Sequence, residues 1–133
     1  MSPTSRPSLP FERPVFARAR RLCLALPEAR EVSSWGHPTF RAGRKTFCTF
    51  EIIKKRPSIA FRLPPTDVNR TLQREGFFST PYGRGLWVSL WVDNAVNWNA
   101  IADLVERSYR CVAIKRMLKA LPVGRAIKRS PSR

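Results

Sequence analysis

The sequence has few of the residues from which metal sites and disulfide frameworks are built. It contains one histidine, His37, and three widely spaced cysteines, Cys23, Cys48 and Cys111. Structural zinc sites draw four ligands mainly from these two residue types, and disulfide frameworks use cysteines in even number. We therefore expect no metal, no cofactor and no disulfide, and we expect buried reduced thiols in a cytoplasmic protein.

Long apolar runs and catalytic motifs are also missing. No stretch approaches the length of a membrane-spanning helix and no signal-peptide core is present, so no membrane partner is expected. The phosphate-loop pattern is absent, and Gly83-Arg84-Gly85 is too short a glycine motif to replace it. No nucleophile and carboxylate are spaced around His37 as a triad requires. We expect no catalytic residues and a protein that is not an enzyme.

Acidic residues are scarce, and the charge that remains is strongly positive. The 133 residues include 25 Lys and Arg but only 9 Asp and Glu, which gives a formal net charge of +16. Six of the basic residues and one acidic residue lie in 1–14 or 123–133, so residues 15–122 keep 19 basic and 8 acidic residues, or +11. A compact domain with this charge repels itself, and nucleic acid is the commonest partner that offsets the repulsion. DNA is the expected partner, and an ordinary basic surface is the alternative.

The chain is long enough for one domain and apolar enough to fold. Its 43% apolar residues include four Trp and eight Phe, which can build a real core. We expect a Ser- and Pro-rich disordered leader at 1–13, one domain at 14–122 and a basic flexible tail at 123–133.

Three helices are predicted from apolar spacing and end signals. The first begins at Pro14, which suits a first helical turn, and ends before Pro27. A short helix at 67–75 has Thr66 as its N-cap and Gly76 at its end. The last long helix follows Asn97, places Asp103 and Glu106 outside, and kinks or continues through 113–121.

Between these helices the sequence alternates as strands do. Strands are predicted at 32–35, 39–40, 46–53, 58–63 and 86–92, with a break at 36–38, turns at 41–44 and 54–57, and a loop at 79–85. The short connections allow only antiparallel pairing. The predicted fold class is therefore α+β, with a twisted antiparallel sheet.

A series of short segments recurs in the order and spacing of one family. The segments are Leu26-Pro27 with Glu31, Ser34-Trp35-Gly36-His37-Pro38 with Phe40, the Gly43 hairpin, Phe77-Phe78, Thr80-Pro81-Tyr82, Gly85-Leu86-Trp87-Val88, Leu104-Val105, Ser108-Tyr109 and Lys115-Arg116. Over roughly residues 14–121 the chain resembles the MmcQ/YjbR family of small bacterial proteins. The resemblance implies a CyaY/frataxin-like fold, in which the N- and C-terminal helices pack together on one face of the sheet. It also implies DNA binding, through a likeness to the "double-wing" module of a phage transcription factor.

Basic side chains at turns and on the last helix are the candidate DNA contacts, because such cations reach phosphate oxygens. The candidates are Arg41, Arg44, Lys45, Lys54, Lys55, Arg56, Arg84, Lys115, Arg116 and Lys119. Alternate turns of a meander emerge at opposite ends, so the two basic turns need not form one patch. Their alternative role is that of ordinary solvated turns, and cations late in a helix also stabilise its dipole.

A second candidate region is a pocket near Trp35, His37 and Tyr82. The structural alternative, which we favour, is that Trp35 packs in the core and His37 fixes a turn by hydrogen bonding. Trp91 and Trp98 are likewise expected in the core. RNA, an acidic protein partner and small-molecule binding in the pocket remain alternatives to DNA. An iron role like that of frataxin is disfavoured, because it uses an acidic ridge and this chain is basic.

Overall fold

The computed structural model describes residues 10–81 and 85–121, and in these ranges six strands form one antiparallel sheet. The strands are β1 (Ala29–Ser34), β2 (His37–Ala42), β3 (Lys45–Ile53), β4 (Arg56–Arg62), β5 (Phe77–Ser79) and β6 (Trp87–Trp91). Their order in the sheet is β1-β2-β3-β4-β6-β5. The first four strands are therefore the predicted meander, and the last two extend it beyond β4.

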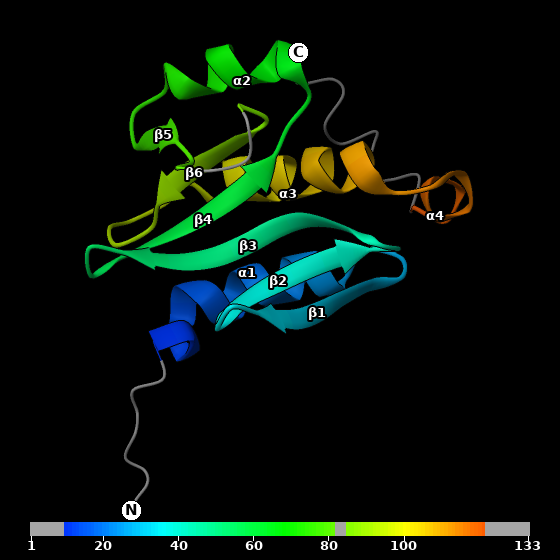
Figure 1. The fold of residues 1–133 in the computed structure, drawn as a ribbon, viewed down its shortest axis with the longest axis horizontal. Helices are drawn as coiled ribbons and strands as arrows, with labels where there is room; N and C mark the ends of the chain where they lie inside the picture. The colour runs from blue at the N-terminus through cyan, green and yellow to red at the C-terminus, as the bar shows by residue number, and fades with distance from the viewer. Residues whose placement is uncertain (1–9, 82–84, 122–133) are drawn as a thin grey trace, which may run out of the picture.

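The longer helices lie on one face of this sheet. The helical elements are the 3-10 turn η2 (Pro10–Glu12), α1 (Pro14–Leu24), α2 (Pro65–Leu72), α3 (Trp98–Val112) and α4 (Lys115–Lys119). Figure 1 shows α1 and α3 behind the sheet, α2 beside β5 and β6, and α4 beyond one end of the strands. This is the α+β architecture that the sequence predicted, with the first and last long helices on the same face.

Tight turns fix the register of the first four strands. Trp35 and Gly36 join β1 to β2, and Lys54 and Lys55 join β3 to β4, all four with φ between 51° and 81°. Two consecutive left-handed residues are typical of the two-residue hairpin turns that match strand twist. The left-handed conformation raises the backbone energy of tryptophan and lysine, because their Cβ atoms crowd the backbone there.

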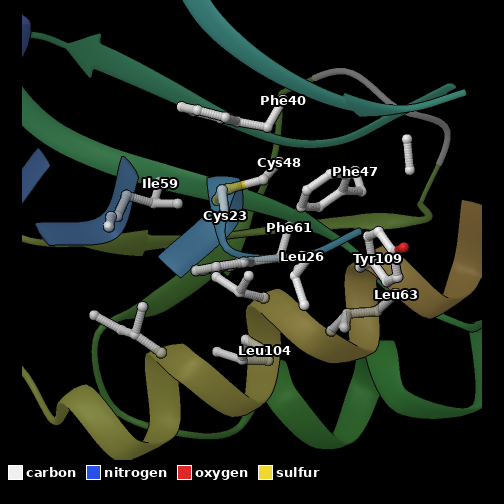
Figure 2. Close-up of a cluster of buried hydrophobic side chains, with 14 of the residues drawn as sticks. Cys23, Leu26, Phe40, Phe47, Cys48, Ile59, Phe61, Leu63, Leu104 and Tyr109 are labelled. Atoms are coloured by element: carbon white, nitrogen blue, oxygen red, sulfur yellow. The ribbon is translucent and has the colours of Figure 1, made fainter. Parts of the chain in front are cut away.

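The core lies between the sheet and the two long helices. Phe16 of α1 stacks on Phe50 of β3 with ring centroids 4.7 Å apart, and Phe40 lies 4.9 Å from the same ring. Cys23 and Cys48 are free thiols in this core (Figure 2). Burial raises the pKa of Cys23 well above its usual value, and its hydrogen bond with Cys48 raises it further.

A bulge lets β3 send two consecutive side chains toward the core. Phe40 pairs with Cys48 but Arg41 pairs with Thr46, so Phe47 is an extra residue in β3. The Phe47 ring is fully buried and meets Tyr109 of α3 edge-on at 5.6 Å. Because the bulge interrupts the alternation of inward and outward side chains, the sequence alone does not indicate which face of this strand is buried.

Several predicted boundaries were wrong for identifiable reasons. The helix α2 begins at Pro65 with Pro64 as its N-cap, since proline needs no amide donor in a first turn, and Thr66 therefore lies inside the helix. It ends at Leu72, before the predicted 75. The strand β5 was not predicted; it lies mostly before the predicted loop at 79–85 and forms because Phe77 pairs with Leu90 across the sheet.

One further correction concerns the side chain of Glu106. Glu106 is buried on α3 instead of lying outside, and it pairs with Arg110. Asn97 caps α3 as predicted, accepting a hydrogen bond from the amide of Ala100. In the part of the chain predicted as leader, the Phe11 ring lies 5.3 Å from Phe16. The predicted tail, 123–133, lies outside the described residues.

We expect Tyr109→Phe to lower the free energy of unfolding by about 1–2 kcal/mol, measured by urea denaturation. The Tyr109 hydroxyl donates to the carbonyl oxygen of Pro27 at 2.7 Å and joins α3 to the segment after α1. The adjacent Ser108 is the matched control, because its hydroxyl is buried without a partner. Ser108→Ala should be neutral or stabilising, and an equal loss in both variants would contradict this account.

Candidate functional site

The face of the sheet opposite α1 and α3 carries a row of short side chains. Thr39 pairs with Thr49, Thr49 with Ala60, and Ala60 with Ser89. Directly paired residues point to the same face, so the four side chains form one row across β2, β3, β4 and β6. All four are buried, although no described helix lies over the near side of these strands in Figure 1. We call this side the open face.

A cavity of about 540 Å³ lies on the open face. Thr39 and Thr49 line it, and so do the aromatic side chains of Trp87 on β6 and Trp35 in the first hairpin turn. Its size lies within the range usual for small-molecule sites. The hollow is explained by the row of short side chains, since larger neighbours rise around it.

Glu51 of β3 also lines the cavity, and it is a buried carboxyl group without a partner. Only 5% of its surface is exposed, and no described residue forms a hydrogen bond or ion pair with it. Burial raises its pKa from 4.5 to about 7. Its cross-strand neighbour Ser58 has a buried hydroxyl that is likewise unpaired.

Three more polar groups near the open face are unpaired. The buried Nδ1 of His37 has no partner, and continuing the β2–β3 register places this residue opposite Glu51. The Nε atoms of Arg41 and Arg62 are also buried and unpaired. Arg41 pairs with Thr46, and Arg62 with Trp87, both of which line the cavity. Unsatisfied buried groups are uncommon in folded proteins, and here they cluster in one region.

The structure changes the predicted roles of the pocket residues. Trp35 is 92% exposed, because it occupies the turn between β1 and β2 instead of the core. His37 does not fix that turn; it is the first residue of β2, and the break at 36–38 shrinks to the turn itself. Trp91 and Trp98 are half-buried at the surface, not fully buried. Tyr82 lies outside the described residues.

Five of the ten predicted basic residues lie together, where α4 meets the turn between β2 and β3. A Cβ added at Gly43 would lie 3.4 Å from the Met117 side chain of α4, so this helix packs against the turn. Arg30 donates to the carbonyl oxygen of Gly43 at 2.9 Å. We call this surface the basic end; its members are Arg30, Arg44, Lys45, Lys115, Arg116 and Lys119.

Most cations of the basic end are exposed and lack an acidic partner. Arg116 pairs with Glu28 at 2.8 Å. The other four that the sequence had singled out form no ion pair with any described residue; they are Arg44, Lys45, Lys115 and Lys119. The basic surface predicted on the last helix therefore also includes the Gly43 turn, which lies about 70 residues earlier in the chain.

The remaining predicted contacts lie elsewhere. Lys54 and Lys55 form the turn at the opposite end of β3, about 26 Å away for a nine-residue strand. Arg56 belongs to β4, where it pairs with Asp93 at 2.6 Å and lies 4.0 Å over the Trp91 ring. Arg41 lies in β2 and not in a turn, because β2 runs to Ala42. Arg84 lies outside the described residues.

Sequence reasoning missed the carboxyl group and the row of short side chains. Glu51 interrupts a run of apolar residues, and this was the available signal that β3 carries a polar site. The local sequence around Arg62 and Trp87 carries no such signal, because only strand pairing brings these two residues to the same face. Within residues 10–81 and 85–121, no group of three or more His, Cys, Asp or Glu could hold a metal ion, and no helix is long and apolar enough to cross a membrane.

The sequence matches the model of the YjbR family over residues 24–111, two thirds of the chain. The chain belongs to the YjbR family. The match covers β1 to β6 and most of α3, and so includes the whole open face. No curated protein matches the sequence.

Solved structures of several bacterial proteins have the same fold. A Deinococcus radiodurans protein with a DUF419 domain is 19% identical, with a TM-score of 0.64 over 77% of this chain and 86% of its own. A Pseudomonas syringae protein is 15% identical, with a TM-score of 0.57 over 63% and 86%. A Bacillus subtilis protein of the DUF1801 family is 15% identical, with a TM-score of 0.57 over 80% and 85%. These likenesses to the YjbR chain show its fold.

We expect the wild-type protein to lose stability relative to Glu51→Gln as the pH rises from about 4.5 to about 7. In this range the unfolded chain holds Glu51 ionised while the folded protein keeps it protonated, so unfolding releases a proton. Above about 7 both states are ionised at this residue and the difference should level off. Urea denaturation at several pH values measures it.

Glu75→Gln is the matched control, because Glu75 is an exposed carboxylate. It should follow the wild-type pH dependence. If Glu51→Gln also follows it, the carboxyl group of Glu51 is not desolvated as described.

Proposed function

We propose that this YjbR protein binds duplex DNA through the basic end, as a cytoplasmic protein and not as an enzyme. The observation that carries the proposal is the packing of α4 against the Gly43 turn. It gathers cations from two distant segments into one surface, where four of them form no ion pair within the described part of the chain. Free cations of this kind can neutralise phosphates and release counterions, which is the main source of sequence-independent DNA affinity.

The distribution of ion pairs in the protein supports the same partner. Ion pairs neutralise several arginines elsewhere, such as Arg20 by Glu31 and Arg107 by Asp103. The basic end keeps most of its charge, so a positive field remains where a polyanion would bind. Its contacts would be to phosphates, and recognition of a base sequence is not part of the proposal.

The test is a matched pair of double variants, each removing two positive charges. Arg44→Gln with Lys119→Gln changes the basic end, and Lys54→Gln with Lys55→Gln changes the opposite turn. Binding to a fluorescein-labelled DNA duplex is followed by fluorescence anisotropy at several salt concentrations. The basic-end variant should bind more weakly and lower the slope of log affinity against log salt by about 1.8, or about 0.9 for each lost contact.

The Lys54 and Lys55 variant should keep nearly the wild-type slope. Equal weakening by both variants would mean a diffuse charge effect, and wild-type binding that ignores salt would contradict phosphate contact. Either result would overturn the proposed interface. No binding to DNA at low salt, together with nuclease-resistant capture of an acidic protein, would favour the acidic-partner alternative.

A further inference from the structure

The cavity on the open face has a different chemistry from the basic end. Unpaired acceptor and donor groups surround it, and two tryptophans line it. We propose that it binds a nucleoside phosphate, with the base beside Trp87 and Glu51 and the phosphate toward Arg41 and Arg62. Its arginine side borders the basic end, because Arg41 pairs with Arg30 across β1 and β2, but the proposal does not depend on duplex binding.

The base is inferred from the wall and the carboxyl group. A planar heteroaromatic ring stacks well on an indole, and such stacking contributes about 1–3 kcal/mol per base in single-strand complexes. Glu51 is buried and has no partner among the described residues, so a ligand with N–H groups would satisfy it. Guanine fits best, because its adjacent ring and amino N–H groups can donate to both oxygens of one carboxylate. The unpaired hydroxyl of Ser58 lies beside this carboxylate in the pairing of β3 with β4.

The phosphate is inferred from two arginines on the Trp87 side of the row of short side chains. Neither lines the cavity, but their cross-strand neighbours Thr46 and Trp87 do. Arg41 and Arg62 are only partly exposed, and the Nε of each is buried without a partner. Arginine binds phosphate oxygens with two parallel hydrogen bonds when both Nε and a terminal nitrogen are available. A nucleoside phosphate would therefore pair groups on both sides of the cavity that the protein leaves unpaired.

The charge of the protein distinguishes this ligand from an organic cation. Tryptophan walls with one carboxylate also suit ammonium groups. However, the chain carries a net charge of +16, which repels cations and attracts anions. Glu51 alone offsets little of this field, and the two arginines lie on the same face. An anionic ligand with a donor-bearing ring is thus favoured over a cationic one.

The nucleotide could be free or part of a single strand, and the experiment separates these sources. Isothermal titration calorimetry is performed at pH 8, above the pKa of Glu51 of about 7, with guanosine 5′-monophosphate, guanosine, inorganic phosphate and a single-stranded oligo(dG) of four residues. Guanosine monophosphate should bind saturably at one site and more tightly than guanosine or phosphate alone. A free-nucleotide site would favour the monophosphate over the oligonucleotide, and a single-strand site would show the reverse order.

Two variants test the residues. Glu51→Gln should weaken guanosine monophosphate about tenfold or more, because the amide cannot accept both N–H groups. Arg62→Gln should weaken the monophosphate but leave guanosine unchanged. Glu75→Gln is the control for charge, and the double variant of Arg44 and Lys119 should keep nucleotide binding even where duplex binding is lost.

The proposal is overturned if guanosine monophosphate does not bind at millimolar concentration, or if Glu51→Gln and Glu75→Gln bind it equally well. It is also overturned if inorganic phosphate binds as tightly as the nucleotide. Glu51→Gln replaces a desolvated acid with a neutral amide of the same size. Its fold can be verified by circular dichroism before the titration, so that a loss of binding is not confused with unfolding.

Discussion

The packing of α1 and α3 on one face of the sheet determines what the other face must do. Stacked phenylalanines hold this layer together, with Phe16 against Phe50 as its centre. A six-stranded sheet covered on one side has to shield its second side with its own side chains. Here large residues at the margins and short ones in the middle provide the cover, and a cavity is the result. The carboxyl of Glu51 is left without a partner in this arrangement, because no described helix covers this face and brings one.

The layers of the fold could be predicted from the sequence because local signals agree with tertiary packing there. Pro14 and Asn97 mark the starts of α1 and α3, and the apolar stripe of α3 matches its buried residues. Disagreements arise where a distant partner decides the structure. Phe77 belongs to a strand only because Leu90 is available, and Glu106 is buried only because the sheet and helices enclose it.

In the candidate sites too, single residues could be predicted from the local sequence, but their grouping depends on distant contacts. The basic residues were visible in the sequence, but their grouping was not, because Met117 of α4 and the Gly43 turn are joined by contact over a long distance in the chain. The open face was even harder to predict from the sequence. Its members come from four strands, and only the register of the sheet shows that Glu51, Arg62 and Trp87 share one side. Trp35 was misjudged because a large apolar residue ordinarily avoids a left-handed turn, and the local sequence carries no sign that it stands there.

The bulge at Phe47 also changes how the sequence of β3 should be aligned with those of related proteins. Inward and outward positions exchange their parity at this residue, so Cys48 and Phe50 follow one phase and Thr46 belongs to another. An alignment that keeps strict alternation through the strand would pair core residues with cavity residues on one side of the bulge. Insertions and deletions of one residue at this point shift the phase of only one part of the strand. The bulge is therefore the place where length variation in β3 exchanges core and open-face positions on one side of the bulge, while the other side keeps its frame.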